Sequence, residues 1–129
     1  MAFDFGTQSI GVAIGQLLTR SATPLKPIAA RNGKPDWQVL DKLIEQWQPR
    51  LFVIGIPLNM DGTESELAKR AHRFARRMEN RFAIPWTGMD ERLSSFDVKA
   101  SLKDRGVKHK GPIDSLAASL ILESWLRLQ

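Results

Sequence analysis

The feature of this sequence that most constrains its fold is a short, uninterrupted apolar run, LFVIGI, at residues 51–56. A strand with one face in water alternates apolar and polar residues, whereas a strand covered on both faces is apolar throughout. The run is rich in branched side chains and stops at Pro57, which is typical of a strand. It therefore predicts a central strand in a sheet with helices on both faces, as in α/β domains.

The rest of the chain predicts strands and helices in alternation around this run. Strands are expected at residues 2–5, 10–15, 22–30 and 84–89. Helices are expected at residues 33–47, 95–103 and 113–128, and a further long helix begins at a capping box of Thr63 and Glu66. Because the alternation in the second half favours parallel pairing, we expect a five-stranded mixed sheet whose first three strands are antiparallel. The 129 residues fit a single domain, residues 1–129.

The absence of cysteine excludes several kinds of site. With no Cys, and with His72 and His109 far apart in the chain, the sequence offers no disulfide, no thiolate nucleophile and no cysteine-ligated zinc. No apolar run approaches the roughly 20 residues that span a bilayer, and the first residues lack a signal-peptide pattern. The expected location is the cytoplasm, and no membrane partner is expected.

The net charge of +5 is unevenly distributed along the chain. Residues 63–82 hold six basic and three acidic residues, and residues 99–110 hold five basic and one acidic. On a helical wheel the basic side chains of the first segment, Arg73 and Arg77 among them, lie opposite its apolar face. Such a surface suits nucleic acid, with Lys108 and Lys110 as further candidates, although a basic helix face is also an ordinary solvated surface.

Four carboxylates are candidates for a metal site. Asp4 lies on the first expected strand, Asp90 and Glu91 follow the last one, and Asp114 begins the last helix. Functional groups of an open α/β sheet collect at the carboxyl ends of its parallel strands, where Gly55 of the intervening strand leaves space. Carboxylates without His or Cys suit Mg²⁺ or Mn²⁺, and a phosphodiester is the matching substrate.

Each of these carboxylates also has a purely structural interpretation. Asp4 could form an ion pair with an arginine, and Asp90 and Glu91 could belong to a solvated turn. Asp114 could simply stabilise the dipole of a helix start. The residues alone leave these alternatives open.

Four motifs, taken together, resemble those of the YqgF/RuvX family of bacterial proteins. They are AFDFGTQSIGVAIG at the start, VIGIPLNMDGTE in the middle, DERLSS after the last strand and KGPIDSLAASLILESW at the end. The resemblance covers essentially the whole chain and implies a ribonuclease H-like fold. Members of this family are described both as Holliday junction resolvases and as nucleases that mature the 5′ end of 16S rRNA.

The resemblance also implies roles for individual residues. It assigns the catalytic and metal-binding carboxylates to Asp4, Glu91 and Asp114, with Asp90 a weaker metal ligand. Contacts with substrate, or the ordering of loops, are implied for the other residues in matching motifs: Arg92, Lys110, Asn59 and Asp61.

Two features depart from the family pattern. Only three residues precede Asp4, so that either the first strand is short or the natural start lies upstream. Gly55 and Ile56 stand where other ribonuclease H-like nucleases often carry an acid, so the implied ligand set is small.

The expected function is that of a Mg²⁺- or Mn²⁺-dependent endonuclease that trims precursor 16S rRNA during ribosome assembly. The expected partners are nucleic acid and ribosome precursors, and the expected state is a monomer or weak dimer. Two alternatives stay open: a Holliday junction resolvase acting on branched DNA, and a non-catalytic RNA-binding assembly factor. DFGTQS also resembles the phosphate loop of the sugar kinase and actin superfamily, but that superfamily needs two related domains and 129 residues supply one.

Overall fold

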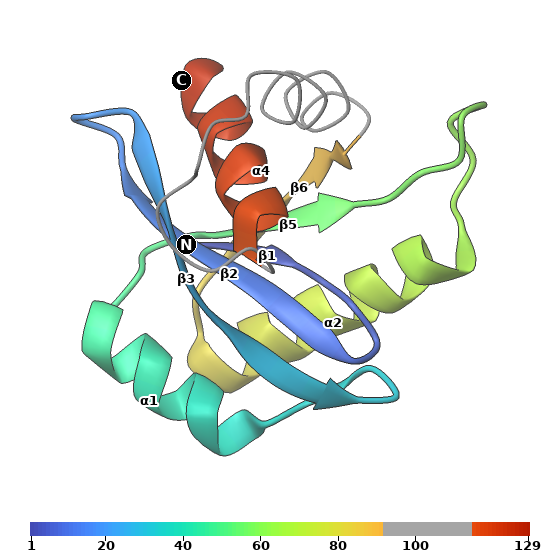
Figure 1. Ribbon diagram of the computed structural model, residues 1–129, viewed down its shortest axis with the longest axis horizontal. Helices are drawn as coiled ribbons and strands as arrows, with labels where there is room; N and C mark the ends of the chain where they lie inside the picture. The colour runs from blue at the N-terminus through green and yellow to red at the C-terminus, as the bar shows by residue number, and fades with distance from the viewer. Residues whose placement is uncertain (92–114) are drawn as a thin grey trace.

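In the part of the chain that the structure describes, six strands form one mixed sheet, and helices cover both of its faces (Figure 1). The computed structural model describes residues 1–91 and 115–129. Its elements, in chain order, are β1 (Ala2–Asp4), β2 (Ser9–Gln16), β3 (Ser21–Arg31), β4 (Lys34–Pro35), α1 (Trp37–Trp47), β5 (Phe52–Ile56), α2 (Glu66–Phe82), β6 (Trp86–Asp90) and α4 (Leu116–Arg127).

The strands lie in the order β4-β3-β2-β1-β5-β6. Antiparallel pairing joins β1 to β2 and β2 to β3, whereas β5 is parallel to β1 and β6 is parallel to β5. The predicted mixed α/β sheet is therefore confirmed. β1 has three residues, in agreement with the expectation of a short first strand.

The predicted number of five strands is wrong, because the segment after β3 forms a hairpin. Asn32 and Gly33 both have positive φ, 50° and 80°, as the central residues of a tight two-residue hairpin turn do. This turn brings Lys34 and Pro35 back alongside the end of β3 as the sixth strand, β4. The helix expected from residue 33 begins only at Trp37, because Asp36 is its N-cap and accepts from the Gln38 and Val39 N–H groups.

The start of α2 also differs from its prediction. Its N-cap is Ser65, whose Oγ accepts a hydrogen bond from the Ala68 N–H at 3.0 Å. Thr63 belongs instead to the preceding loop, where its hydroxyl donates to the Asp61 carboxylate at 2.6 Å and accepts from the Asn59 side-chain amide at 3.0 Å. The predicted capping box of Thr63 and Glu66 is therefore wrong, although the long helix itself is present.

Two apolar cores lie on opposite faces of the sheet. On one face Phe3 and Ile54 pack with residues of α1 and α2, and on the other Ala2 and Val53 pack with α4. Consecutive residues of a strand point to opposite faces, so β1 and β5 contribute to both cores. All five residues of β5 are buried, which confirms the central strand predicted from LFVIGI.

Arg81 links the two helices on the first face. Its guanidinium donates to both carboxylate oxygens of Asp41 in α1, each at 2.8 Å, and lies 5.1 Å from the centre of the Trp37 ring. These hydrogen bonds hold the pKa of the Asp41 carboxyl below its ordinary value. The side chain of Arg81 therefore has a structural role, which is to hold α2 against α1.

α4 comprises Leu116–Arg127, with Ser115 as its N-cap, and the first two residues of the helix predicted at 113–128 lie outside the described residues. The helix predicted at residues 95–103 lies outside the described residues. Within residues 1–91 and 115–129, no helix combines the length and the apolar character that a membrane span requires.

Candidate active site

Asp4 is the last residue of β1, and its side chain is on the face that α4 covers. This follows from the alternation along the strand, because Ala2 packs in the α4 core and Phe3 in the opposite one. In the register of β1 and β5, Phe3 lies opposite Ile54, so Asp4 is level with Gly55. The half-buried Asp4 carboxylate makes no hydrogen bond or ion pair with the residues that the structure describes, so no arginine there neutralises it.

Glu91 approaches the same place from the other side of β5. It directly follows β6, and its Oε1 lies 2.6 Å from the point that a Cβ on Gly55 would occupy. Val53, two residues before Gly55, packs in the α4 core, so Glu91 covers Gly55 on the α4 face. Adjacent strands are about 4.8 Å apart, and β1 and β6 are separated by two such spacings. Because the side chain of Glu91 reaches back over β5, it lies about one strand spacing closer to Asp4 than the backbone of β6 does.

The structure places the other candidate carboxylates differently. Asp90 pairs with Ile56, whose side chain belongs to the α1 and α2 core, so the register puts Asp90 on the face opposite Glu91. Asp114 lies outside the described residues, as do the candidate substrate contacts Arg92, Lys108 and Lys110.

Ser115, which sequence reasoning did not single out, fixes the start of α4 over the sheet. It is fully buried, and its Oγ accepts a hydrogen bond from the Val12 N–H at 3.0 Å. Val12 is adjacent in β2 to Gly11, the residue paired with Asp4. The chain therefore enters α4 close to the strand that carries Asp4.

Asn59 belongs to the loop between β5 and α2, which projects away from the body of the protein (Figure 1). Its side-chain amide donates to the Thr63 hydroxyl at 3.0 Å, and its backbone N–H bonds to the Thr63 carbonyl at 2.9 Å. Asp61 accepts from both the backbone and the hydroxyl of Thr63. In this structure Asn59 and Asp61 thus order the loop that leaves the carboxyl end of β5.

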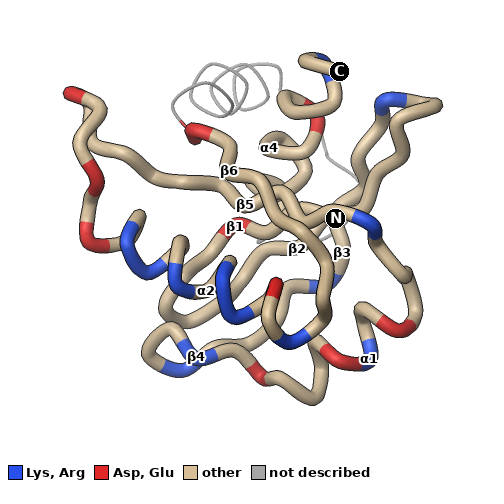
Figure 2. Tube along the Cα trace, turned by 180° about the vertical axis from the view of Figure 1, so that it is seen from behind, with Lys and Arg blue, Asp and Glu red and all other residues tan. Residues whose placement is uncertain are grey.

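The basic residues of α2 are spread along the helix, which lies on the other side of the sheet from α4 (Figures 1 and 2). Arg73 and Arg77 are exposed there and line a small cavity that also includes Phe5. They do not share a face with Asp4 and Glu91. The cavity that they line is nevertheless close to Asp4 along the chain, because Phe5, another residue of its lining, directly follows Asp4.

The donor chemistry of Asp4 and Glu91 suits a hard divalent cation. Carboxylate oxygens are the ligands that Mg²⁺ uses in proteins, and it keeps several waters, so two carboxylates are enough to anchor it. No group of three or more His, Cys, Asp or Glu side chains capable of holding a metal occurs in residues 1–91 and 115–129. Within this part of the chain, Asp4 and Glu91 are the predicted carboxylates that share the α4 face of the sheet.

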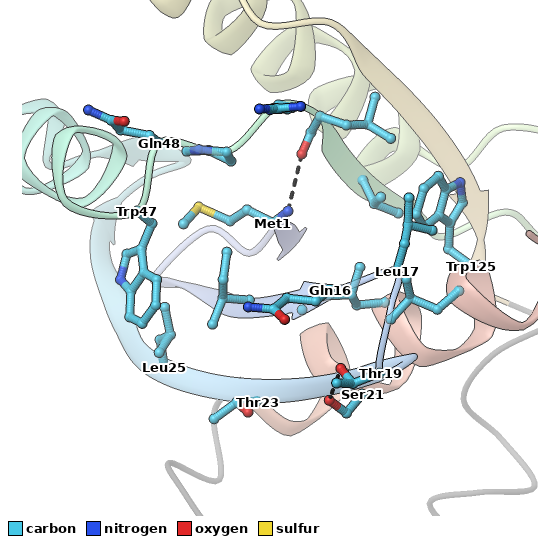
Figure 3. Close-up of a pocket in the computed structure, with 18 residues that line it drawn as sticks. Met1, Gln16, Leu17, Thr19, Ser21, Thr23, Leu25, Trp47, Gln48 and Trp125 are labelled. Carbon is cyan, nitrogen blue, oxygen red and sulfur yellow. Dashed lines mark hydrogen bonds between the residues drawn. The ribbon is translucent and has the colours of Figure 1, made fainter.

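A larger cavity, of about 780 Å³, lies at the opposite end of the sheet (Figure 3). Its lining includes Trp47, Trp125 and Met1, whose amino group donates to the Leu51 carbonyl at 3.1 Å. Burial lowers the pKa of that amino group to about 6. No Asp, Glu or His is among the 18 residues drawn around this cavity, which makes it unsuitable for carboxylate-based chemistry.

Comparison with known proteins identifies the family to which this chain belongs. The model of the RuvX family, described as Holliday junction resolvase, matches residues 1–128. Relatives from Yersinia pestis (strain Pestoides F) and Yersinia pseudotuberculosis serotype O:1b (strain IP 31758), both named "Putative pre-16S rRNA nuclease", are each 52% identical over 128 residues, which cover 97% of this chain and 91% of theirs.

A solved structure shares the fold at much lower sequence identity. It is RuvC of T. thermophilus in complex with a Holliday junction substrate, with a TM-score of 0.57 and 13% identity over 98% of this chain and 92% of that one. At this identity the likeness shows the architecture alone. On the family match and the 52% identical relatives, the chain belongs to the RuvX (YqgF) family.

Proposed function

We propose that this chain is a Mg²⁺- or Mn²⁺-dependent endonuclease that hydrolyses phosphodiester bonds in the 5′-end maturation of precursor 16S rRNA, acting on ribosome precursors in the cytoplasm. The observation that carries the proposal is the pair of carboxylates, Asp4 and Glu91, on one face of the sheet on either side of Gly55. The names of the 52% identical relatives support the RNA substrate, and the description of the family supports a nuclease.

The chain's contribution to this chemistry is to fix the metal-binding carboxylates at one edge of the sheet. Strand pairing on both sides of β1 sets the position of Asp4. The side chain of Glu91 lies over Gly55, the one glycine of β5. Asp114 is the proposed third ligand. When bound, the divalent cation supplies an activated water and neutralises the leaving oxygen of the phosphodiester. The proposed substrate contacts are Arg92, Lys108, Lys110, Arg73, Arg77 and Asn59.

Replacing Asp4 with Asn tests the proposal directly. The substitution preserves the size of the side chain and removes its charge, so cleavage of precursor 16S rRNA should fall at least about 100-fold. RNA affinity and the free energy of unfolding should change little, because Asp4 makes no ion pair with the described residues. Asp41→Asn, on the α1 and α2 side, is the matched control and should remain active.

A Holliday junction resolvase is the second candidate, favoured by the description of the matching family. Labelled precursor 16S rRNA, linear duplex DNA and a four-way junction, each with Mg²⁺, Mn²⁺ or EDTA, separate the two functions. Selective metal-dependent cleavage of the RNA supports the proposal, whereas paired symmetrical cuts in the junction support the resolvase. RNA binding without cleavage of any substrate would overturn both and indicate an assembly factor.

A further inference from the structure

The small cavity beside α2 has a strongly basic lining. It has a volume of about 220 Å³ and is lined by four basic side chains and no acidic one. Its apolar wall includes the buried ring of Phe74 and the ring of Phe5. A volume below the usual range of 300 to 1,000 Å³ for small-molecule sites suits a single anionic group rather than a whole ligand.

One side of this cavity is rigidly built. The Arg70 guanidinium donates to the Asn32 carbonyl at 2.6 Å, which ties α2 to the turn between β3 and β4. The Gly33 N–H bonds in turn to the Thr7 carbonyl at 2.9 Å. Gly33 also permits the close approach of Arg70, because a Cβ there would lie 2.5 Å from the Arg70 Nη2. The wall is therefore held in place before any ligand arrives.

The other basic side chains of the cavity are not held by such hydrogen bonds. Arg73 and Arg77 lie one helical turn apart and are exposed, and neither forms a hydrogen bond or ion pair with residues in the described part of the chain. Like charges at this spacing repel one another, by a few tenths of a kcal/mol. Lys34 of β4 adds a third positive charge. Such a cluster is stabilised by an anion, and the planar donors of an arginine match the geometry of a phosphate group.

The position of the cavity relates it to the carboxylate site. Phe5 lines it and directly follows Asp4, but the two side chains point to opposite faces of the sheet. If the cleaved phosphate of a bound strand lies beside Asp4, the strand has to pass from the α4 face to the α2 face of the sheet to bring another of its phosphates to the cavity.

We infer that Lys34, Arg73 and Arg77 form a pocket that binds one backbone phosphate of the RNA substrate, away from the cleaved bond. The inference rests on the proposed function for the identity of the strand. Nothing in the pocket takes part in the hydrolysis, so its contribution is to affinity and to the position of the strand.

The test compares two double variants of α2 that remove the same charge. Arg73→Ala with Arg77→Ala empties the pocket, whereas Lys69→Ala with Arg76→Ala removes two exposed cations of the same helix that do not line it. Binding of a single-stranded 20-nucleotide segment of precursor 16S rRNA is measured in EDTA over a range of salt concentrations. We expect the first variant to bind at least about tenfold more weakly, with the slope of log K against log salt reduced by about 0.7, and the second to lose less than about threefold.

Equal losses of affinity in the two variants would overturn the pocket and leave only a diffuse positive surface. Denaturation of both variants checks their folding, and removal of Arg73 and Arg77 should not lower the free energy of unfolding, since it relieves repulsion. Failure of the pocket remains distinguishable from failure of the proposed function. The former appears as equal or no loss of binding in the two variants while cleavage still depends on Asp4. The latter appears as selectively weakened binding in the Arg73 and Arg77 variant of a protein that cleaves no substrate or cleaves without Asp4.

Discussion

At the scale of single residues, Gly55 decides whether Asp4 and Glu91 can belong to one site. The side chain of Glu91 occupies the space that a residue-55 side chain would fill, with Ile121 of α4 packed against the same point. The sequence predicted that Gly55 leaves space between the carboxylates, and the structure confirms it. The sequence could not predict that Glu91 folds back over the glycine, because that depends on how the chain turns after β6.

Replacing Gly55 with Ala should damage the site more than it damages the fold. The added methyl group collides with Glu91 Oε1 and the Ile121 side chain, so Glu91 is displaced. We expect cleavage to fall about 100-fold and the free energy of unfolding to fall by about 1 to 3 kcal/mol. Gly88→Ala in the neighbouring strand is the control, because its nearest atom is the Ile56 Cγ1 at 3.2 Å. Wild-type cleavage by Gly55→Ala would contradict the proposed role of Glu91.

At the scale of elements, long periodic segments were predictable and short or competing ones were not. The central strand and α2 follow from patterns of many residues, and both are present. β4 has only two residues and depends on the Asn32–Gly33 turn, a hairpin signal that the following Pro35 obscured. The capping error at Thr63 has a similar cause, since a side-chain contact with Asp61 competes with the cap.

The contact between Ser115 and β2 is the element-scale feature most open to test. Ser115→Ala leaves the buried Val12 N–H without its acceptor, which should lower the free energy of unfolding by about 1 to 3 kcal/mol in urea denaturation. Ser119→Ala is the matched control in α4, since its hydroxyl donates only to the Leu116 carbonyl one turn back. It should cost less than about 1 kcal/mol. Equal costs for the two variants would show that the bond to Val12 does not anchor the helix.

At the scale of the whole molecule, one sheet is shared by two cores, and this explains why the site could be predicted only in part. The alternation of β1 and β5 assigns Asp4 to the α4 face and Phe5 to the α2 face, so topology brings Asp4 and Glu91 together. The same topology puts Asp90 on the other face, although the sequence had grouped it with the other carboxylates, and Arg73 and Arg77 of the predicted basic helix lie on that face as well. Spacing along the chain indicates which edge a residue reaches, but not which side of the sheet it faces.

Because β1 and β5 contribute side chains to both cores, the two faces should unfold as one unit. Leu40→Ala removes a fully buried side chain on the α1 face, and Ile121→Ala removes one on the α4 face. Each should lower the free energy of unfolding by about 2 to 5 kcal/mol, and the costs should add in the double variant because the sites lie on opposite sides of the sheet. Tryptophan fluorescence and far-ultraviolet circular dichroism should give one coincident transition in every variant. A second transition that only Ile121→Ala shifts would show instead that α4 unfolds separately, and that the carboxylate edge beneath it can open while the α1 and α2 core stays intact.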